Sequence, residues 1–184
     1  VELADANKEL LALCEKAQIP FGTTFLGLSA APTEHPLNMG RLGMHGNLGP
    51  NVMTNQCDLL IAVGMRFDDR VTGNLKNYAK QAKIIHLEID PSEVDKNVKV
   101  DLPVLGDCKQ TLPAITKLVD KAKHQSWIDG FKPYDEKEYN KVIEPALHPT
   151  EGPLLMGEIV RKLSDAANSE AIMVTDVGQN QMFG

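Results

Sequence analysis

The chain has 184 residues, of which 42% are hydrophobic and 24% are charged, and its formal net charge is −6. This length is enough for one full hydrophobic core and part of a second, and the composition is ordinary for a globular protein. The acidic balance and the scattered lysines and arginines argue against a nucleic-acid surface. The sequence also contains no apolar run long enough to span a bilayer and no signal-peptide pattern.

The first fifty residues are predicted to form a helix, a strand and a long loop. Apolar residues recur at three- and four-residue steps over residues 3–17, which is typical of an amphipathic helix, and residues 19–24 follow as a strand. Residues 27–50 are rich in Gly and Pro and show little periodicity, so we expect a loop there, with a turn near residues 36–39. A loop of this length inside a compact domain is usually functional.

The centre of the predicted sheet is a run of five apolar residues at positions 59–63. Such a run suits a strand that is buried on both faces, as in a parallel sheet. Before this run, Asn47 is expected to cap a short helix over residues 47–56. After it, residues 73–81 are expected to form a short helix or a turn.

Two more strands and a helix complete the predicted first domain. Residues 83–89 form the next strand, Val104 and Leu105 close a weaker one, and a helix starts from Asp107. Pro113 is expected to delay the first regular turn of that helix. Strands and helices that alternate at this spacing predict an α/β fold, an open, Rossmann-like parallel sheet with helices on both faces and right-handed crossovers.

The last sixty residues change in character. Residues 125–150 hold four of the nine aromatic residues among charges and prolines, which indicates a connector packed on a surface. A helix follows Pro153, and residues 171–175 are predicted to be a buried strand. We therefore predict a first domain over residues 1–124, the connector, and the start of a second α/β domain over residues 151–184.

The cysteines and histidines do not indicate a disulfide framework or a metal site. Cys14, Cys57 and Cys108 are odd in number and widely spaced, which is typical of reduced thiols in a cytosolic-type compartment. The histidines lack zinc-type spacing, and His86 lies inside a predicted strand as a core or interface residue. No Ser-His-Asp or Cys-His arrangement can be argued, so no catalytic residue is predicted in this chain.

Charged side chains follow the strand at residues 59–63 directly; they are Arg66, Asp68, Asp69 and Arg70. In open α/β sheets, ligands bind outside the carboxyl ends of the strands. One interpretation is a set of exposed ion pairs, which contribute little to stability. The other is that at least one arginine binds a phosphate while the carboxylates orient it. The position at a strand end favours the second interpretation.

Three other positions near strand ends are candidates for ligand binding. Residues 43–46 form a Gly-x-x-Gly sequence around His45, which suits either a tight turn with a local hydrogen bond or a loop that approaches a ligand. Glu88 ends a strand, where an acid faces ribose hydroxyls or merely solvent. Asp107 suits a helix N-cap, which directs backbone N–H groups toward a ligand. The dinucleotide and P-loop fingerprints do not occur.

Several strings in the sequence resemble one enzyme family; they are TTFLGLSA, HPLNMGRLGMHG, DLLIAVGMRFDDRVTG, KIIHLEIDPSEVDKN and VTDVGQNQM. Together they resemble the large catalytic subunit of acetohydroxyacid synthase (acetolactate synthase) over nearly the whole chain. The resemblance implies a transferase that depends on thiamine diphosphate and Mg²⁺. This family decarboxylates pyruvate and joins the two-carbon unit to a second 2-ketoacid, in branched-chain amino-acid biosynthesis.

The resemblance also implies which residues contact cofactors. The central domain would hold FAD, without net redox chemistry, through Thr24, Phe25, Leu26, Leu42, Gly43, Met44, His45, Gly64, Met65, Arg66, Asp68, Arg70, Val71, Glu88, Ile89, Asp107 and Cys108. The second domain would face thiamine diphosphate through Val177, Gly178, Gln179 and Asn180. Met44, Asp69 and Arg70 would also lie toward the substrate channel. This sequence differs from the family's common pattern at Asn180, where His is usual, and at Glu88, where Asp is usual.

The same resemblance places the remaining active-site parts outside the chain, which begins without a methionine. The glutamate that activates the thiazolium would lie before Val1, and so would a first strand of the central domain. The segment that binds the metal would lie after Gly184. We therefore expect a fragment that is inactive alone, from a cytoplasmic homo-oligomer that acts on 2-ketoacids, with a small regulatory subunit as a further partner. The alternatives are a sister thiamine-diphosphate carboligase or decarboxylase, or a non-catalytic nucleotide-binding regulatory module.

Overall fold

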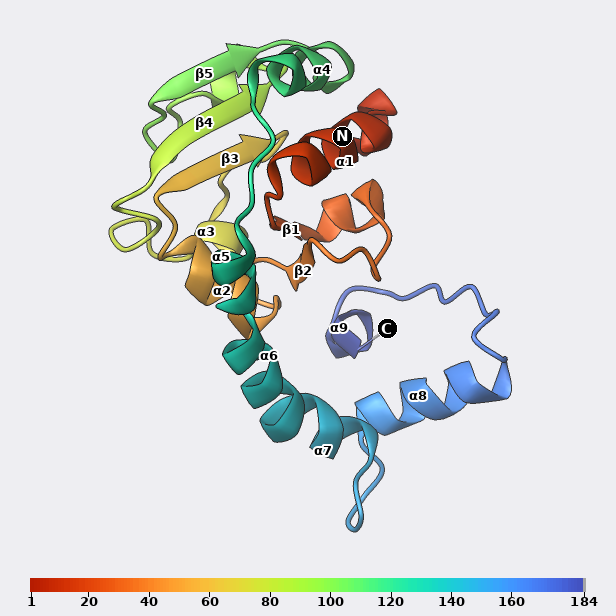
Figure 1. Cartoon of the computed structure of the whole chain (residues 1–184). Helices are drawn as coiled ribbons and strands as arrows, with labels where there is room; N and C mark the ends of the chain where they lie inside the picture. Colours follow the sequence, from red (N-terminus) through yellow and green to blue (C-terminus); the bar gives the residue numbers. More distant parts are fainter. Residues whose placement is uncertain (184) are drawn as a thin grey trace. The chain divides into compact units, whose positions relative to one another are not determined.

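The computed structural model describes residues 1–183 of the chain (Figure 1). These residues divide into two compact units, residues 1–133 and residues 134–183. The predicted boundaries at residues 124 and 150 stay predictions. No helix among the described residues is long and apolar enough to cross a membrane.

The strands of the first unit all pair in parallel. Strand β1 (Phe21–Thr23) pairs with β2 (Asn38–Arg41), and a three-stranded sheet has the order β3 (Leu59–Val63), β4 (Lys83–Glu88) and β5 (Leu102–Leu105). The predicted α/β fold class with parallel strands is confirmed. The strands lie in two sheets rather than one continuous sheet.

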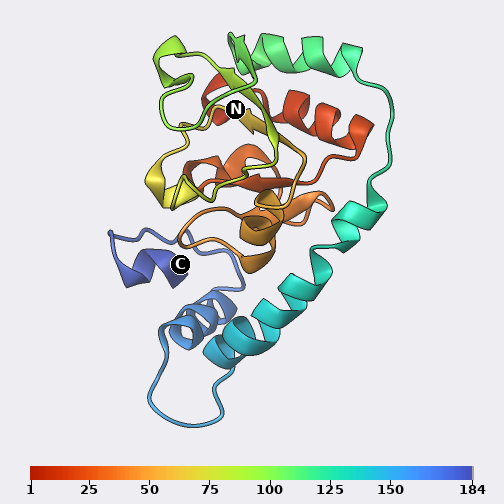
Figure 2. The same ribbon diagram turned by 90° about the vertical axis from the view of Figure 1, so that its left-hand side faces the viewer.

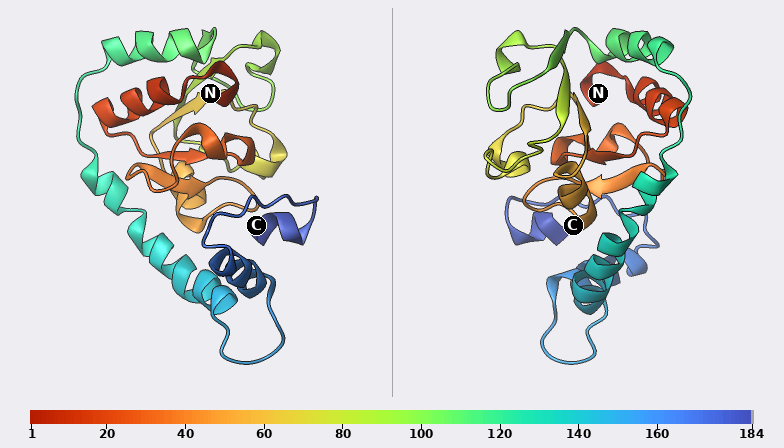
Figure 3. Two further views of the ribbon diagram at one scale, coloured as in Figure 1. Left: turned by 90° about the vertical axis from the view of Figure 1, so that its right-hand side faces the viewer. Right: turned by 60° about the vertical axis from the view of Figure 1, so that its left-hand side comes forward.

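The helices of the first unit lie between and after these strands. They are α1 (Asn7–Ala17), α2 (Leu48–Thr54), α3 (Asp69–Thr72), α4 (Cys108–Leu118) and α5 (Gln125–Asp129), with the 3₁₀ turns η1 (Glu2–Ala4), η2 (Phe25–Ala30) and η3 (Pro91–Glu93). Figures 2 and 3 show α1 and α4 side by side, and the two helices are in contact.

Side chains on successive strand residues point to opposite faces of the larger sheet, because the strand period is two. Leu87 on β4 belongs to a core cluster with Leu13 of α1 and Leu112 of α4. Ile84 points to the other face, where Phe67 and other residues from turns and loops form a second cluster. The sheet is therefore covered on one face by α1 and α4 and on the other by turns and loops.

The expected loop at residues 27–50 is wrong in part, because it contains η2 and strand β2. The segment Asn38–Arg41 has no alternating apolar pattern, and its strand character comes from pairing with β1. The turn expected at residues 36–39 is present at Pro36 and Leu37, where the Asn38 N–H donates to the His35 carbonyl at 2.8 Å, and β2 follows it directly. Asn47 does occupy the N-cap position of α2, but its side chain accepts a hydrogen bond from the Arg41 N–H at 2.8 Å instead of capping the helix.

The expectations about strand burial and proline have different outcomes. Strand β3 packs on both faces, with Ile61 and Val63 against the first core cluster and Leu60 and Ala62 in the second, although its first residue, Leu59, is 45% exposed. Pro113 does not delay α4, which starts at Cys108 and continues through the proline. The Asp107 carboxylate accepts a hydrogen bond from the Lys109 N–H at 2.8 Å, and this cap holds the first turn in place.

Residues 125–183 are more helical than predicted. The expected connector contains α5, α6 (Lys132–Glu138), a π-helical turn η4 (Tyr139–Ile143) and α7 (Glu144–Leu147), and the second unit continues with α8 (Met156–Ala166) and α9 (Gln179–Phe183). The predicted buried strand at residues 171–175 is wrong, since Ile172 and Val174 are 93% and 91% exposed. A strand requires a hydrogen-bonded neighbour, and none of the described residues provides one.

Candidate cofactor-binding site at the strand ends

The carboxyl ends of β3, β4 and β5 meet at one edge of the sheet because the strands are parallel. Sharp turns leave this edge at Gly64, with φ of 60°, and at Gly106, with φ of 149°. The Gly64 N–H donates to the Leu87 carbonyl at 2.8 Å, and the Gly106 N–H donates to the Glu88 carbonyl at 3.0 Å. The strand ends are therefore tied to one another by backbone hydrogen bonds.

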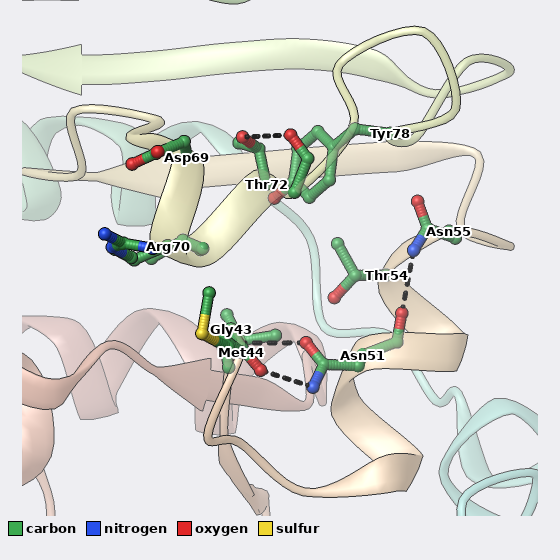
Figure 4. A pocket seen from close by; sticks show the side chains of 12 residues that line it. Gly43, Met44, Asn51, Thr54, Asn55, Asp69, Arg70, Thr72 and Tyr78 are labelled. Carbon is green, nitrogen blue, oxygen red and sulfur yellow. Dashed lines mark hydrogen bonds between the residues drawn. The ribbon is translucent and has the colours of Figure 1, made fainter.

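A pocket of about 310 Å³ lies between two segments that the sequence singles out (Figure 4). One wall comes from the turn at residues 43–46 and from α2, and the other from α3 and the residues after it. The lining residues include Leu42, Gly43, Met44, Asn51, Thr54, Asp69, Arg70, Val71 and Tyr78.

Direct backbone contact joins the two walls. The Met44 N–H donates to the Arg70 carbonyl at 2.7 Å. A Cβ atom at Gly43 would lie 2.6 Å from the Arg70 carbonyl oxygen, and Gly43 has a φ of +98°. Only glycine fits this position without strain, because the backbone here lies so close to α3 and has a positive φ. The Gly-x-x-Gly segment is a tight turn, in which the Gly46 N–H donates to the Gly43 carbonyl at 2.9 Å.

The four charged residues after β3 have different roles. Asp68 caps α3 by accepting a hydrogen bond from the Arg70 N–H at 3.0 Å. Arg66 lies 3.8 Å from Asp68, but its side chain is 68% exposed, so this pair contributes little to stability. The Arg70 guanidinium and the Asp69 carboxylate are exposed at the pocket, with no side-chain partner among the described residues. Arg70 is thus open to an anion.

Glu88 and His86 form a buried polar pair at the end of β4. Glu88 is 7% exposed, and its carboxylate accepts hydrogen bonds from the backbone N–H groups of Ile89 and Asp90, at 2.9 and 3.3 Å. His86 is fully buried, and its Nε2 lies 2.9 Å from the Met65 carbonyl and 3.6 Å from Glu88. A carbonyl only accepts, so Nε2 donates, and Nδ1 has no hydrogen-bond partner in the described residues.

His86 is a core residue, as the sequence analysis expected, and it also connects two strand ends. Its ring packs edge-on against Phe67, with ring centroids 5.1 Å apart. The bond to Met65 holds the segment after β3 against β4. The Glu88 carboxylate is not solvated, so the solvated strand end considered for it is wrong.

The helix that follows β5 starts close to the same edge. Asp107 is its N-cap, as expected, and Cys108 is buried in its first turn. Burial raises the pKa of the Cys108 thiol; the chain's amino terminus lowers it, and the nearby Asp107 and Glu88 carboxylates raise it further. The thiol is therefore kept neutral beside two carboxylates.

The other residues implied by the resemblance lie at different distances from this pocket. The Leu42 N–H donates to the Thr23 carbonyl at 2.8 Å, which places the end of β1 beside the 43–46 turn. Thr24 follows directly, and Phe25 and Leu26 in η2 are 48% and 86% exposed. His45 is exposed in the turn, and Ile89 is 68% exposed.

The positions implied for thiamine diphosphate lie in the second unit. Val177 is 87% exposed, and its N–H donates to the Asp176 carboxylate at 2.6 Å. Gly178 has a φ of +141°, and Gln179 and Asn180 begin α9.

Sequence reasoning missed two asparagines of the pocket lining, Asn51 and Asn55. They follow Asn47 at four-residue steps, from the N-cap of α2 to its C-cap. Asn is an unfavourable residue inside helices, because its side chain competes for backbone hydrogen bonds. A four-residue repeat of Asn was therefore the signal, and only the first of the three was considered, as a helix cap.

The chain thus contains a parallel α/β domain with a pocket between the 43–46 turn and α3. A family model described as "Thiamine pyrophosphate enzyme, central domain" matches residues 1–115. This match covers more than half of the chain, so the chain belongs to that family.

Relatives of known name are similar over the full chain. The probable acetolactate synthase large subunit of Methanocaldococcus jannaschii is 39% identical over 193 residues, covering 100% of this chain and 32% of that protein. The acetolactate synthase large subunit of Parasynechococcus marenigrum is 39% identical, covering 98% and 29%, and that of Haemophilus influenzae is 32% identical, covering 98% and 32%. The chain thus spans about a third of the length of these relatives.

Proposed function

We propose that this chain is the FAD-binding central part of the catalytic subunit of a thiamine-diphosphate-dependent acetolactate synthase. The observation that carries the proposal is the pocket where the 43–46 turn meets α3, with the Arg70 guanidinium open to an anion. The named relatives support the choice of reaction, since they are acetolactate synthase large subunits.

The residues present fit a dinucleotide such as FAD. A pocket of about 310 Å³ holds part of such a ligand, and the remainder would extend along the edge where β3, β4 and β5 end. Arg70 and Arg66 supply positive charge for phosphate or ring oxygens. Gly64 and Gly106 leave room for the ligand because they carry no side chain at the turns.

The roles of the cofactors follow from this proposal. Thiamine diphosphate, with Mg²⁺, would supply the decarboxylation of pyruvate and its ligation to a second 2-ketoacid, and FAD would have a structural role. The protein's part is to bind and orient these groups. We propose further that the whole enzyme is a cytoplasmic homo-oligomer, open to a small regulatory subunit, and that these 184 residues are inactive by themselves.

Flavin affinity of the full-length protein tests the binding role. Replacing Arg66 or Arg70 with Ala should each weaken FAD binding by about ten- to a hundredfold, because a charge-assisted hydrogen bond contributes about 1.5–3 kcal/mol. The measurement is the quenching of flavin fluorescence in a titration at fixed ionic strength.

Lys76→Ala is the matched control, because Lys76 is also an exposed cation in the same region but lies outside the pocket. Its FAD affinity should equal that of the unchanged protein. Unchanged affinity in both arginine variants would contradict the assigned site, and a full-length protein that binds no FAD would contradict the cofactor itself.

A further inference from the structure

Three asparagines on one side of α2 hold backbone segments that lie outside the helix. Residues four apart share a helix face, so Asn47, Asn51 and Asn55 form a row. Asn47 accepts a hydrogen bond from the Arg41 N–H at 2.8 Å, and Asn55 accepts one from the Ala79 N–H at 2.9 Å. We name these three residues the asparagine row.

Asn51, at the centre of the row, makes the most complete contact. Its Oδ1 accepts a hydrogen bond from the Gly43 N–H at 2.9 Å, and its Nδ2 donates to the Gly43 carbonyl at 2.8 Å. Figure 4 shows this carboxamide facing the backbone of Gly43, with the Arg70 side chain across the pocket on α3. One side chain therefore pairs both polar backbone groups of one glycine.

The Gly43 backbone is held from two directions as a result. Asn51 holds it from α2. From α3, the Arg70 carbonyl lies against Gly43 and accepts a hydrogen bond at 2.7 Å from the N–H of Met44, the residue after Gly43. Glycine at a positive φ is otherwise the most adaptable point of a chain. The two contacts remove this freedom at the point where the turn enters the pocket wall.

We infer that Asn51 is a positioning residue for the proposed flavin site, and this inference rests on the proposed function. Asn51 fixes the orientation of the Gly43 peptide, so that the 43–46 turn and α3 form one pocket. Residues in a binding site are held in place in this way by neighbours whose hydrogen bonds fix their geometry.

The chemistry of the contact explains why asparagine is required. Leu has the same branching but makes no hydrogen bonds, so the Gly43 N–H loses its acceptor and the Gly43 carbonyl keeps only the bond from the Gly46 N–H, at 2.9 Å. Asp keeps the acceptor for the N–H but replaces the donor with an anionic oxygen beside the Gly43 carbonyl. The two substitutions therefore remove both hydrogen bonds and one hydrogen bond, respectively.

The test combines amide hydrogen exchange with flavin titration on the full-length protein. Without FAD, Asn51→Leu should raise the exchange rate at Gly43 and over residues 40–46 about tenfold, since the amide loses its acceptor. The same variant should weaken FAD binding about tenfold, and Asn51→Asp should have an intermediate effect on both.

Asn74→Leu is the matched control. Asn74 also accepts a hydrogen bond from a backbone N–H, that of Lys76 at 3.0 Å, but it does not line the pocket. This variant should leave exchange over residues 40–46 and the FAD affinity unchanged.

The outcomes separate this inference from the proposed function. Faster exchange at Gly43 in a protein that never binds FAD would reject the cofactor and retain the positioning of the turn. Unchanged exchange in Asn51→Leu, or faster exchange with the original FAD affinity, would overturn the inference. If Asn51→Leu does not fold, Asn51→Asp decides, because it keeps the side-chain volume and one hydrogen bond; unaltered exchange and affinity in that variant would also overturn it.

Discussion

The three cysteine thiols are buried to different extents, and burial raises their pKa values accordingly. Burial raises the pKa of Cys14 to about 12, with a smaller contribution from the neighbouring Glu15 carboxylate. Burial also raises the pKa of Cys57 to about 11, again with a contribution from an adjacent carboxylate, that of Asp58. All of the cysteines are free thiols, and Cys57 is the one that is not fully buried.

Alkylation rates should follow this order. The thiolate is the nucleophile, so a difference of one pKa unit makes its population tenfold smaller at a given pH. At pH 8.5 we expect iodoacetamide to label Cys57 at least about tenfold faster than Cys14 in the folded protein, and both rates to increase with pH. Mass spectrometry of quenched digests measures the two rates. Equal rates in the folded protein, or a faster reaction at Cys14, would contradict this account of the burial.

Helices α1 and α4 are in contact in the larger core. Leu112 on α4 is fully buried in the cluster that includes Leu10 and Leu13 of α1 and Leu87 of β4. Leu118 ends the same helix and is 86% exposed. The two leucines therefore provide a buried and an exposed position on one element.

Leu112→Ala should lower the free energy of unfolding by about 2–5 kcal/mol, because it removes buried methyl groups and leaves a cavity. Leu118→Ala should change it by less than about 0.5 kcal/mol, because that side chain is mainly in water. Urea unfolding followed by circular dichroism measures both. A loss of similar size in the two variants would show that the α1–α4 contact does not hold this core.

The elements that the sequence predicted correctly are those with a local pattern. Strands β3 and β4 are short apolar runs, and α1 and α4 have helical spacing, so each is visible without tertiary information. Strand β2 has no such pattern; it depends on pairing with β1 and on Gly40, which Asn47 approaches closely. The apolar residues 171–175 have a strand-like pattern without a paired neighbour, which shows that composition alone does not make a strand.

The same distinction applies to the candidate site. The loops after β3, β4 and β5 gather at one edge of the sheet because the strands are parallel. The sequence could therefore indicate this arrangement. The bonds from Asn51 to Gly43 and from His86 to Met65 join residues 8 and 21 positions apart, and no periodicity encodes them. These contacts required the structure because they depend on where side chains lie after folding.

At the scale of the whole molecule, the chain spans about a third of its relatives, and its family match covers residues 1–115. Its described residues contain the candidate pocket and a second, helical unit, and under the proposed function catalysis needs the full-length protein. The last prediction therefore concerns the product that the full-length protein makes and its dependence on cofactors.

The full-length protein, supplied with thiamine diphosphate and Mg²⁺, should form acetolactate from pyruvate only when FAD is also present. The 184 residues alone should form none under the same conditions. The measurement is the amount of acetolactate formed with and without added FAD, after removal of bound flavin. Formation without any dependence on FAD would keep the proposed reaction and reject a flavin role for the pocket. Bound flavin without acetolactate would instead indicate a sister carboligase or decarboxylase, because the enzyme would then bind the same cofactor but act on another substrate.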